Sequence, residues 1–281
     1  MINPTVVDAR TDVTTKLLAD EGYAVISQGD EADEEQEETY FARDFEKKFF
    51  SEETNKIFVK TFMDNALRDP ITGEIGKGII FCVSRKHAAK ITQLLNVYAD
   101  MMFPGKYCSD FAMQITSDVM NAQTYTINFQ NNNLSGTTSF LEGYKSSKTR
   151  ICVTVGMMTT GYDCEDLLNI GLLRPIFSPT DFIQIKGRGT RKHDFIFKER
   201  NGGQEIVHKY PKETFKLFDF FGNCEYFEEK FDYDEVLELP RFQGSSVSLG
   251  TPPVDPDGYE NFAPDPLKTL VETKILSLIH I

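Results

Sequence analysis

The chain has 281 residues, of which 40% are hydrophobic, 12% aromatic and 26% charged, and this composition excludes a globally disordered protein. No apolar run approaches the roughly 20 residues that span a bilayer, and the N-terminus lacks the pattern of a signal peptide, so we expect a cytoplasmic protein without a membrane partner. Five cysteines without C-x-x-C spacing argue against a zinc site or disulfide framework, and a net charge of −13 argues against simple electrostatic binding to nucleic acid.

The first 76 residues predict short extended and helical segments around an acidic loop. Residues 5–9 and 23–26 have β character, and residues 29–38 are too acidic to pack against a core. Within residues 39–69, phenylalanines recur at four-residue spacing, which predicts helical structure.

From residue 77 onward, buried strands are predicted to alternate with helices. Apolar runs typical of strands lie at 78–83, 111–115, 150–155, 168–173 and 215–220. Helices are expected at 85–98, after a cap at 117–118, around 140–144 and at 179–191. Such alternation predicts an α/β fold in which helices cover both faces of a parallel sheet.

After Pro240 the sequence becomes rich in glycine, serine and proline, which indicates a linker. Only residues 267–281 regain helical periodicity. We therefore expect three parts: a preceding segment at 1–76, an α/β domain at 77–240, and a linker with the start of a helical region at 241–281. Because no further domain is completed, the chain is expected to be a fragment.

Residues 184–191, Gln-Ile-Lys-Gly-Arg-Gly-Thr-Arg, place one amide and two guanidinium groups on a short segment. On a helix, Gln184, Arg188 and Arg191 share a face, so their polar ends can converge on one anion. The planar guanidinium group suits phosphate oxygens. The alternative interpretation is a surface helix with stray positive charge.

In an open parallel sheet, ligands bind at the carboxyl ends of the strands. Four candidate segments follow predicted strands there: 84–86, 116–117, 156–163 and 178–180. Ser84 and Ser117 could also serve simply as helix caps, and capping leaves other N–H groups at a helix terminus available for phosphate.

Three other patterns imitate metal or phosphate sites, but each lacks the necessary context. The acidic residues at 30–33 do not directly follow a buried strand, and the glycines at 73–78 precede their strand and lack the hydroxyl of a phosphate loop. The acids at 264–274 fall on a predicted helix, whereas a nuclease metal site normally uses adjoining strands. We assign no metal site to the chain.

Residues 153–163 and 182–191 together resemble motifs V and VI of superfamily 2 helicases and DNA translocases, and look most like the motor subunit of type I restriction enzymes. The resemblance covers roughly residues 77–223. It implies that 77–240 form a second RecA-like motor domain and that 1–76 connect two motor lobes. Another superfamily 2 DNA or RNA helicase, or a non-catalytic interaction module on the same fold, are the alternatives.

The resemblance implies a role for the motif VI residues in ATP hydrolysis. Arg188 and Arg191 match the arginines that stabilise the transition state of phosphoryl transfer, and Gln184 matches a glutamine near the phosphates or the attacking water. Further nucleotide contacts are expected at Gly161, Asp163 and Gly187. ATP and Mg²⁺ would be held mainly by a first motor lobe, so the isolated chain should be inactive.

The resemblance also implies contact with DNA. Ser84 and Arg85 resemble motif IV, and Thr116 and Ser117 a neighbouring motif, which contact the nucleic-acid backbone. Residues 77–212 carry 17 Lys and Arg against 11 Asp and Glu, so this part is basic although the chain is acidic. The implied partners are double-stranded DNA, the first motor lobe, a nuclease domain, and methylation and specificity subunits.

Overall fold

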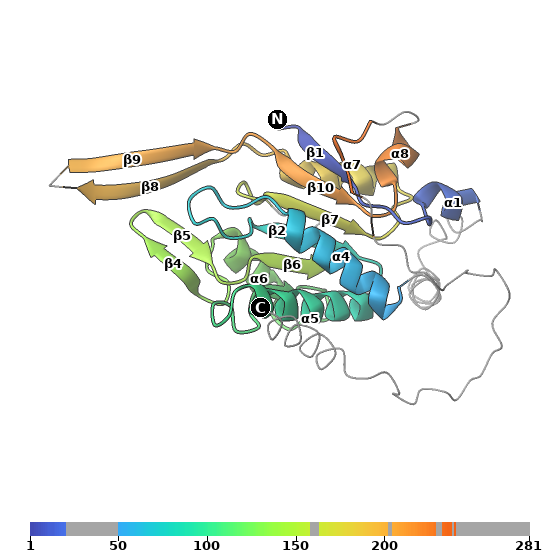
Figure 1. Cartoon of the computed structure of the whole chain (residues 1–281), viewed down its shortest axis with the longest axis horizontal. Helices are drawn as coiled ribbons and strands as arrows, with labels where there is room; N and C mark the ends of the chain where they lie inside the picture. The colour runs from blue at the N-terminus through green and yellow to red at the C-terminus, as the bar shows by residue number, and fades with distance from the viewer. Residues whose placement is uncertain (21–49, 158–162, 202–203, 229–231, 238, 240–281) are drawn as a thin grey trace, which may run out of the picture. The chain divides into compact units, whose positions relative to one another are not determined.

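The computed structural model describes residues 1–20, 50–157, 163–201, 204–228, 232–237 and 239 (Figure 1). Residues Met1–Leu239 form one compact unit, to which the description below refers. Several predictions lie outside the described residues. These are the strand at 23–26, the acidic loop at 29–38, the acidic patterns at 30–33 and 264–274, and the linker and helix after residue 240.

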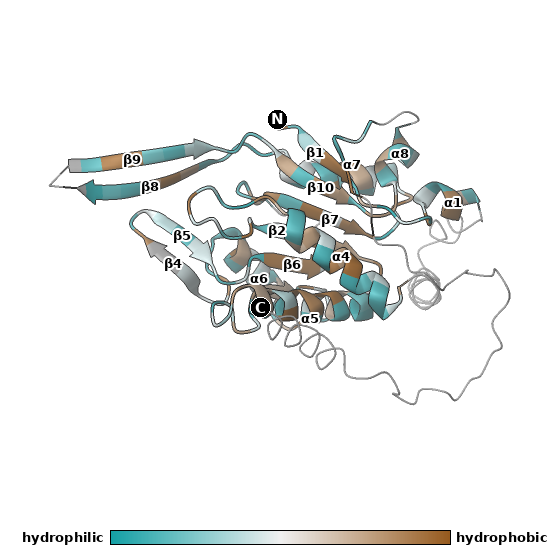
Figure 2. Ribbon diagram, viewed as in Figure 1, coloured by the Kyte–Doolittle hydropathy of each residue, from teal (hydrophilic) through white to brown (hydrophobic). Residues whose placement is uncertain are grey.

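A parallel sheet of seven strands forms the centre of the described unit, in the order β11-β1-β10-β7-β2-β6-β3. The strands are β1 (Pro4–Asp8), β2 (Gly78–Cys82), β3 (Ala112–Gln114), β6 (Ile151–Thr154), β7 (Asn169–Leu173), β10 (Phe215–Asp219) and β11 (Glu235–Val236). Strands β2, β6, β7 and β10 carry mostly hydrophobic residues (Figure 2), as expected for strands covered on both faces. The predicted α/β fold, built on a parallel sheet with flanking helices, is confirmed.

Helices cover both faces of this sheet. Among the described residues they are α1 (Thr15–Asp20), α4 (Glu52–Asn65), α5 (Arg85–Met102), α6 (Ala122–Gln130), α7 (Pro179–Gly189) and α8 (Asn223–Phe227). On one face, Phe62 of α4 packs on Phe218 with ring centroids 5.0 Å apart. On the other, Phe182 and Ile185 of α7 share a buried cluster with Leu172 of β7. None of these described helices has the length and apolarity to cross a membrane.

The N-terminal segment contributes directly to the sheet. Strand β1 pairs along its whole length with β10, from Pro4 opposite Phe215 to Asp8 opposite Asp219. Helix α4, predicted within 39–69, packs against α5 on one side of the sheet. The division between residues 76 and 77 stays a prediction, but β1 and α4 are built into the same unit as the motif-bearing strands.

The helix expected around 140–144 is wrong. Strands β4 (Thr137–Leu141) and β5 (Tyr144–Ser147) form an antiparallel hairpin instead. Gly143 has a φ of 79°, a left-handed backbone conformation that closes the two-residue turn between Leu141 and Tyr144. The short turn lets the two strands pair, which a helix through Gly143 would not.

The helix cap expected at 117–118 is also wrong. These residues form a turn after β3, and α6 begins only at Ala122, after Asn121 in a left-handed conformation. The Ser117 side chain is directed to Arg85 instead.

A second hairpin was not predicted from the sequence. Strands β8 (Asp194–Asn201) and β9 (Gln204–Pro211) pair over eight residues each and project beyond the sheet on the same side as β4 and β5 (Figure 1). The usable signal was the Gly202-Gly203 pair between two segments with β-forming residues, a typical hairpin turn.

Candidate functional site

The predicted DNA-contact residues gather at the carboxyl edge of β2 and β3. These strands flank β6 on either side, so the segments that follow them meet. Arg85 Nη2 donates a hydrogen bond of 3.1 Å to Ser117 Oγ, and its Nε lies 3.6 Å from a carboxylate oxygen of Asp118. The side chain of Arg85 is 60% exposed. The exposed guanidinium group of Arg85 and the hydroxyl group of Ser117 therefore lie together at the carboxyl edge of the sheet, where the sequence placed both residues.

Ser84 and Thr116 hold this region in place. Ser84 Oγ accepts a hydrogen bond of 3.0 Å from His87 N–H and caps α5, which is one of its two predicted roles. Thr116 is buried, and its hydroxyl donates to Asp118 at 2.5 Å. That hydrogen bond and the nearby Arg85 lower the pKa of Asp118. The ionised Asp118 carboxylate therefore offsets part of the positive charge of Arg85.

The local sequence explains why α7 presents its polar residues outward. Ser178 Oγ accepts from Asp181 N–H at 3.3 Å, and Pro179 occupies the first turn, both typical of a helix start. Phe182 and Ile185 are buried, whereas Gln184 and Arg188, one turn apart, are partly exposed. The predicted shared face is present for these two residues.

Arg191 follows two residues after α7 and joins the two motif segments. Its Nε lies 3.0 Å from Asp163 Oδ1, and the side chains are 58% and 53% exposed. This contact connects the ends of the segments that resemble motifs VI and V, 28 positions apart in the sequence. Gly161 lies outside the described residues, so its predicted nucleotide contact stays untested.

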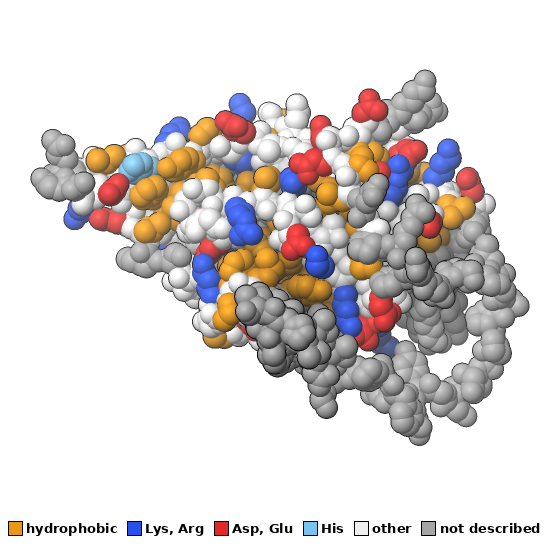
Figure 3. All heavy atoms as spheres, in the orientation of Figure 1, with side chains coloured by type: hydrophobic (Ala, Val, Ile, Leu, Met, Phe, Trp, Pro, Cys, Tyr) orange, Lys and Arg blue, Asp and Glu red, His pale blue; other side chains and the backbone are white. Residues whose placement is uncertain are grey.

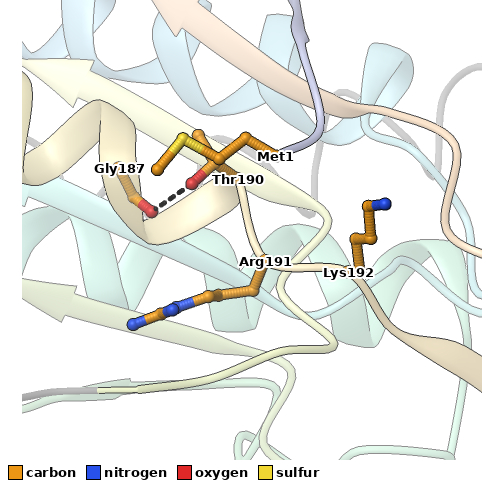
Figure 4. Close-up of a pocket in the computed structure, with 5 residues that line it drawn as sticks. All are labelled: Met1, Gly187, Thr190, Arg191 and Lys192. Carbon is orange, nitrogen blue, oxygen red and sulfur yellow. Dashed lines mark hydrogen bonds between the residues drawn. The ribbon is translucent and has the colours of Figure 1, made fainter.

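An open cavity of about 360 Å³ adjoins Arg191 (Figure 4). Its lining residues are Met1, Gly187, Thr190, Arg191 and Lys192. Thr190 Oγ1 donates to the Gly187 carbonyl at 2.9 Å and closes the last turn of the helix. A Cβ on Gly187 would meet nothing within 4 Å, so no packing within the described residues demands a glycine there.

Arg191 and Asp163 do not lie at the carboxyl edge of the sheet, where the sequence placed the segment 156–163. Helix α7 starts at that edge and runs back along the sheet, so that Thr190 accepts a hydrogen bond from Ile2 N–H just before β1. Cys164 lies 3.6 Å from Lys77 Nζ, just before β2. The pair therefore belongs to the amino-end side, and the two candidate sites are separate.

A buried ion pair fixes the segment after Asp163. Lys77 Nζ lies 2.8 Å from the Asp166 carboxylate and also donates to the Phe129 carbonyl at 2.8 Å. Burial acts to raise the pKa of Asp166, but Lys77 and the hydrogen bonds from Cys164 and Asn132 together outweigh burial, and the pKa falls to about 2. Lys77 thus has a structural role.

Charge on the visible surface is mixed. Figure 3 shows basic and acidic side chains interspersed among apolar ones on this face, without a single extended basic patch. Any contact with nucleic acid through this face would therefore depend on individual cations and not on a broad positive field.

No family model matches the chain, but known proteins are similar to it in sequence. The EcoAI endonuclease subunit of a type I restriction enzyme from Escherichia coli is 28% identical over 195 residues, which is 69% of this chain and 20% of that protein. The EcoKI endonuclease subunit from Escherichia coli K12 is 27% identical over 147 residues, 51% of this chain and 10% of that protein. The chain thus matches a fifth or less of the length of these relatives.

Solved structures include a fragment from Vibrio vulnificus YJ016 assigned to the HsdR subunit of a type I restriction enzyme. It covers 84% of this chain, which matches 36% of that structure, at 21% identity and a TM-score of 0.46. Similarity at this level carries no argument beyond the sequence matches. The chain is therefore similar in sequence to part of the endonuclease subunits of two type I restriction enzymes.

Proposed function

We propose that the described unit is the second RecA-like domain of a DNA-translocating motor in a type I restriction enzyme, and that it supplies the arginine side of a composite ATPase site. The observation that carries this proposal is the contact between Arg191 and Asp163, which unites two motif segments beside an open cavity. Gln184 and Arg188 lie on the preceding helix with their side chains partly exposed.

The side chains present fit a triphosphate. ATP with Mg²⁺ would supply the phosphoryl group and the divalent charge. Arg188 and Arg191 would donate hydrogen bonds to phosphate oxygens and offset the negative charge of the transition state, while Gln184 would orient the phosphates or the attacking water. Because the contact between Arg191 and Asp163 is exposed, a phosphate can replace the carboxylate at small cost.

Mg²⁺ and most of the triphosphate are assigned to a first RecA-like domain. Among the described residues, no group of three or more His, Cys, Asp and Glu side chains is placed to hold a metal ion. The domain would therefore contribute positive charge across an interdomain cleft but would not hold the cofactor alone.

Arg85 and Ser117 are proposed to form part of a DNA track at the carboxyl edge. Arg85 is exposed next to the N-terminus of α5, where a guanidinium group and helix N–H groups both favour a phosphate. Double-stranded DNA, a nuclease domain, and methylation and specificity subunits are the partners of this proposal.

The test is DNA-stimulated ATP hydrolysis by the complete motor subunit. We expect Arg188→Ala and Arg191→Ala each to lower kcat by about 10³-fold, the scale associated with arginine fingers. Arg200→Ala is the matched control, since Arg200 lies on the β8–β9 hairpin and pairs with Glu142. Undiminished hydrolysis in both motif variants, or turnover by the 281-residue chain alone, would refute the proposal.

A further inference from the structure

Lys212 lies where the two motif segments of the candidate nucleotide site approach each other. Its Nζ donates hydrogen bonds of 2.8 Å to the Gly189 carbonyl and 3.1 Å to the Glu165 carbonyl. Gly189 ends helix α7, just before Arg191, and Glu165 follows Asp163 by two residues. One ammonium group therefore fastens the segment that carries Arg191 to the segment that carries Asp163.

The surroundings leave the Lys212 side chain little freedom. The residue is only 6% exposed, and its Nζ lies 5.8 Å from the centroid of the Phe215 ring. Its backbone N–H donates to the His193 carbonyl at 2.8 Å, at the base of the β8–β9 hairpin. Lys212 is thus held from both its backbone and its side chain.

The charge of Lys212 suits its place at the end of a helix. Burial lowers the pKa of Lys212 to about 8, and the nearby Cys164, Asp166 and Glu165 act in the opposite direction. The group is therefore predominantly protonated at neutral pH. A cation is favoured at the C-terminus of a helix, where the last carbonyl groups lack partners within the helix.

We propose that Lys212 is a positioning residue for the contact between Arg191 and Asp163. Without touching the nucleotide, its ammonium group keeps the two segments in register so that their exposed side chains face each other. The exposed contact alone would hold them only weakly, since solvent screens it. The meaning of this role for ATP hydrolysis rests on the proposed function, but the fastening itself is a property of the ligand-free chain.

The first test compares Lys212→Met with Lys209→Met in the 281-residue chain by amide hydrogen exchange. Methionine keeps much of the apolar stem but removes the ammonium group. Lys209 is the matched control, because it is an exposed hairpin lysine paired with Asp194. In Lys212→Met, exchange at residues 164–166 and 189–193 should accelerate by about tenfold or more, with the central strands unchanged, since hydrogen bonds from a charged donor are lost.

Exchange in Lys212→Met that equals that of Lys209→Met at both segments would overturn the proposal. If Lys212→Met does not fold, the positioning role is tested with Lys212→Arg instead, because this variant keeps a cation at the two carbonyl groups. Protection of both segments within about twofold of the wild type supports the proposal. Acceleration of about tenfold at both segments in Lys212→Arg contradicts it.

The second test uses the complete motor subunit and separates this proposal from the proposed function. Lys212→Met should lower kcat by about tenfold or more with little change in KM for ATP, because a misplaced charge costs transition-state stabilisation. Lys212→Arg should restore most of the rate. Full activity of both Arg188→Ala and Arg191→Ala overturns the proposed function but leaves the exchange result standing. Inactive Arg191→Ala combined with unchanged exchange in Lys212→Met overturns the positioning role alone.

Discussion

The end of α7 and the carboxyl edge near α5 each hold an exposed arginine, but with different supporting contacts. Each region presents an exposed arginine next to a carboxylate from a distant segment, at 3.0 Å for Arg191 and Asp163 and 3.6 Å for Arg85 and Asp118. At the α7 end, the buried side chain of Lys212 lies behind the contact and donates to the carbonyl groups of Gly189 and Glu165. At the α5 edge, Asp118 is fixed by the neighbouring Thr116 hydroxyl.

The difference shows how a domain can present charge without a rigid surface. Exposed ion pairs contribute only about 0–1 kcal/mol, so either carboxylate can give way to a phosphate. Position must then come from groups out of contact with the ligand. Near α7 these groups make buried polar contacts, whose loss costs much of the free energy of folding. Near α5 they are a helix cap and a turn. The four predictions that follow test this contrast.

The largest effect on stability is expected from Lys77→Met. The substitution leaves the buried Asp166 carboxylate without its cation, and removing one partner of a buried pair costs about 3–5 kcal/mol. Urea denaturation measures the loss. Lys60→Met is the control, because Lys60 and Asp64 form an exposed i,i+4 pair worth about 0.3–0.5 kcal/mol. Equal losses in the two variants would contradict the contrast between buried and exposed support.

Two glycines on α7 should respond in opposite directions. A Cβ on Gly189 would lie 2.2 Å from the Phe215 ring, so Gly189→Ala should destabilise the fold by about 1–3 kcal/mol. Gly187 has open space, and alanine there should stabilise the helix by up to about 1 kcal/mol. Thermal unfolding of the two variants distinguishes them. Destabilisation by Gly187→Ala would show that the end of α7 packs differently.

Acid should loosen the α5 edge through His87. Its Nδ1 accepts from Val83 N–H at 3.4 Å, and its Nε2 lies 3.0 Å from Asn55 Oδ1, an arrangement that uses the neutral ring. Burial lowers the pKa of His87 to about 3. Because the unfolded chain binds the proton more readily, this contribution to stability is complete well above pH 6.5 and is lost as the pH drops toward 3, by about 3 kcal/mol near pH 4.5.

Nuclear magnetic resonance titration measures the His87 ring directly. We expect no protonation of this ring above about pH 4 in the folded chain. A midpoint for His87 near 6.5 would refute the prediction.

The smallest effect is expected from Asp118→Asn. Removing the carboxylate beside Arg85 should raise affinity for duplex DNA by up to about fivefold, since an exposed pair is worth 1 kcal/mol or less. Asp64→Asn removes the same charge from α4 and controls for the change in net charge. Fluorescence anisotropy at fixed salt measures both variants. An equal change in the two would indicate that Arg85 has no special role.

Much of the fold could be predicted because its strands are short apolar runs between turn residues. The runs at 78–83, 150–155, 168–173 and 215–220 each became a central strand. The error at 140–144 arose because a few apolar residues do not distinguish a helix from a strand. Gly143 was the available evidence for the turn. The β8–β9 hairpin was missed although Gly202-Gly203 offered a comparable signal.

The candidate sites were predictable in composition but not in arrangement. The spacing of Gln184 and Arg188 follows from the period of a helix, which local sequence determines. That Arg191 meets Asp163, and that Arg85 meets Ser117, depends on strand order, which the sequence pattern leaves open. The spatial separation of the two sites also depends on the path of α7 along the sheet.

The sequence by itself determined the α/β class, the motif segments and the resemblance to a second RecA-like domain, because periodicity and residue type act over a few neighbouring positions. Only the tertiary structure decided that β1 completes the sheet beside β10 and that Lys212 joins Gly189 to Glu165. Such contacts link segments far apart in the chain. They form because a buried polar group must find its partners wherever the packed fold places them.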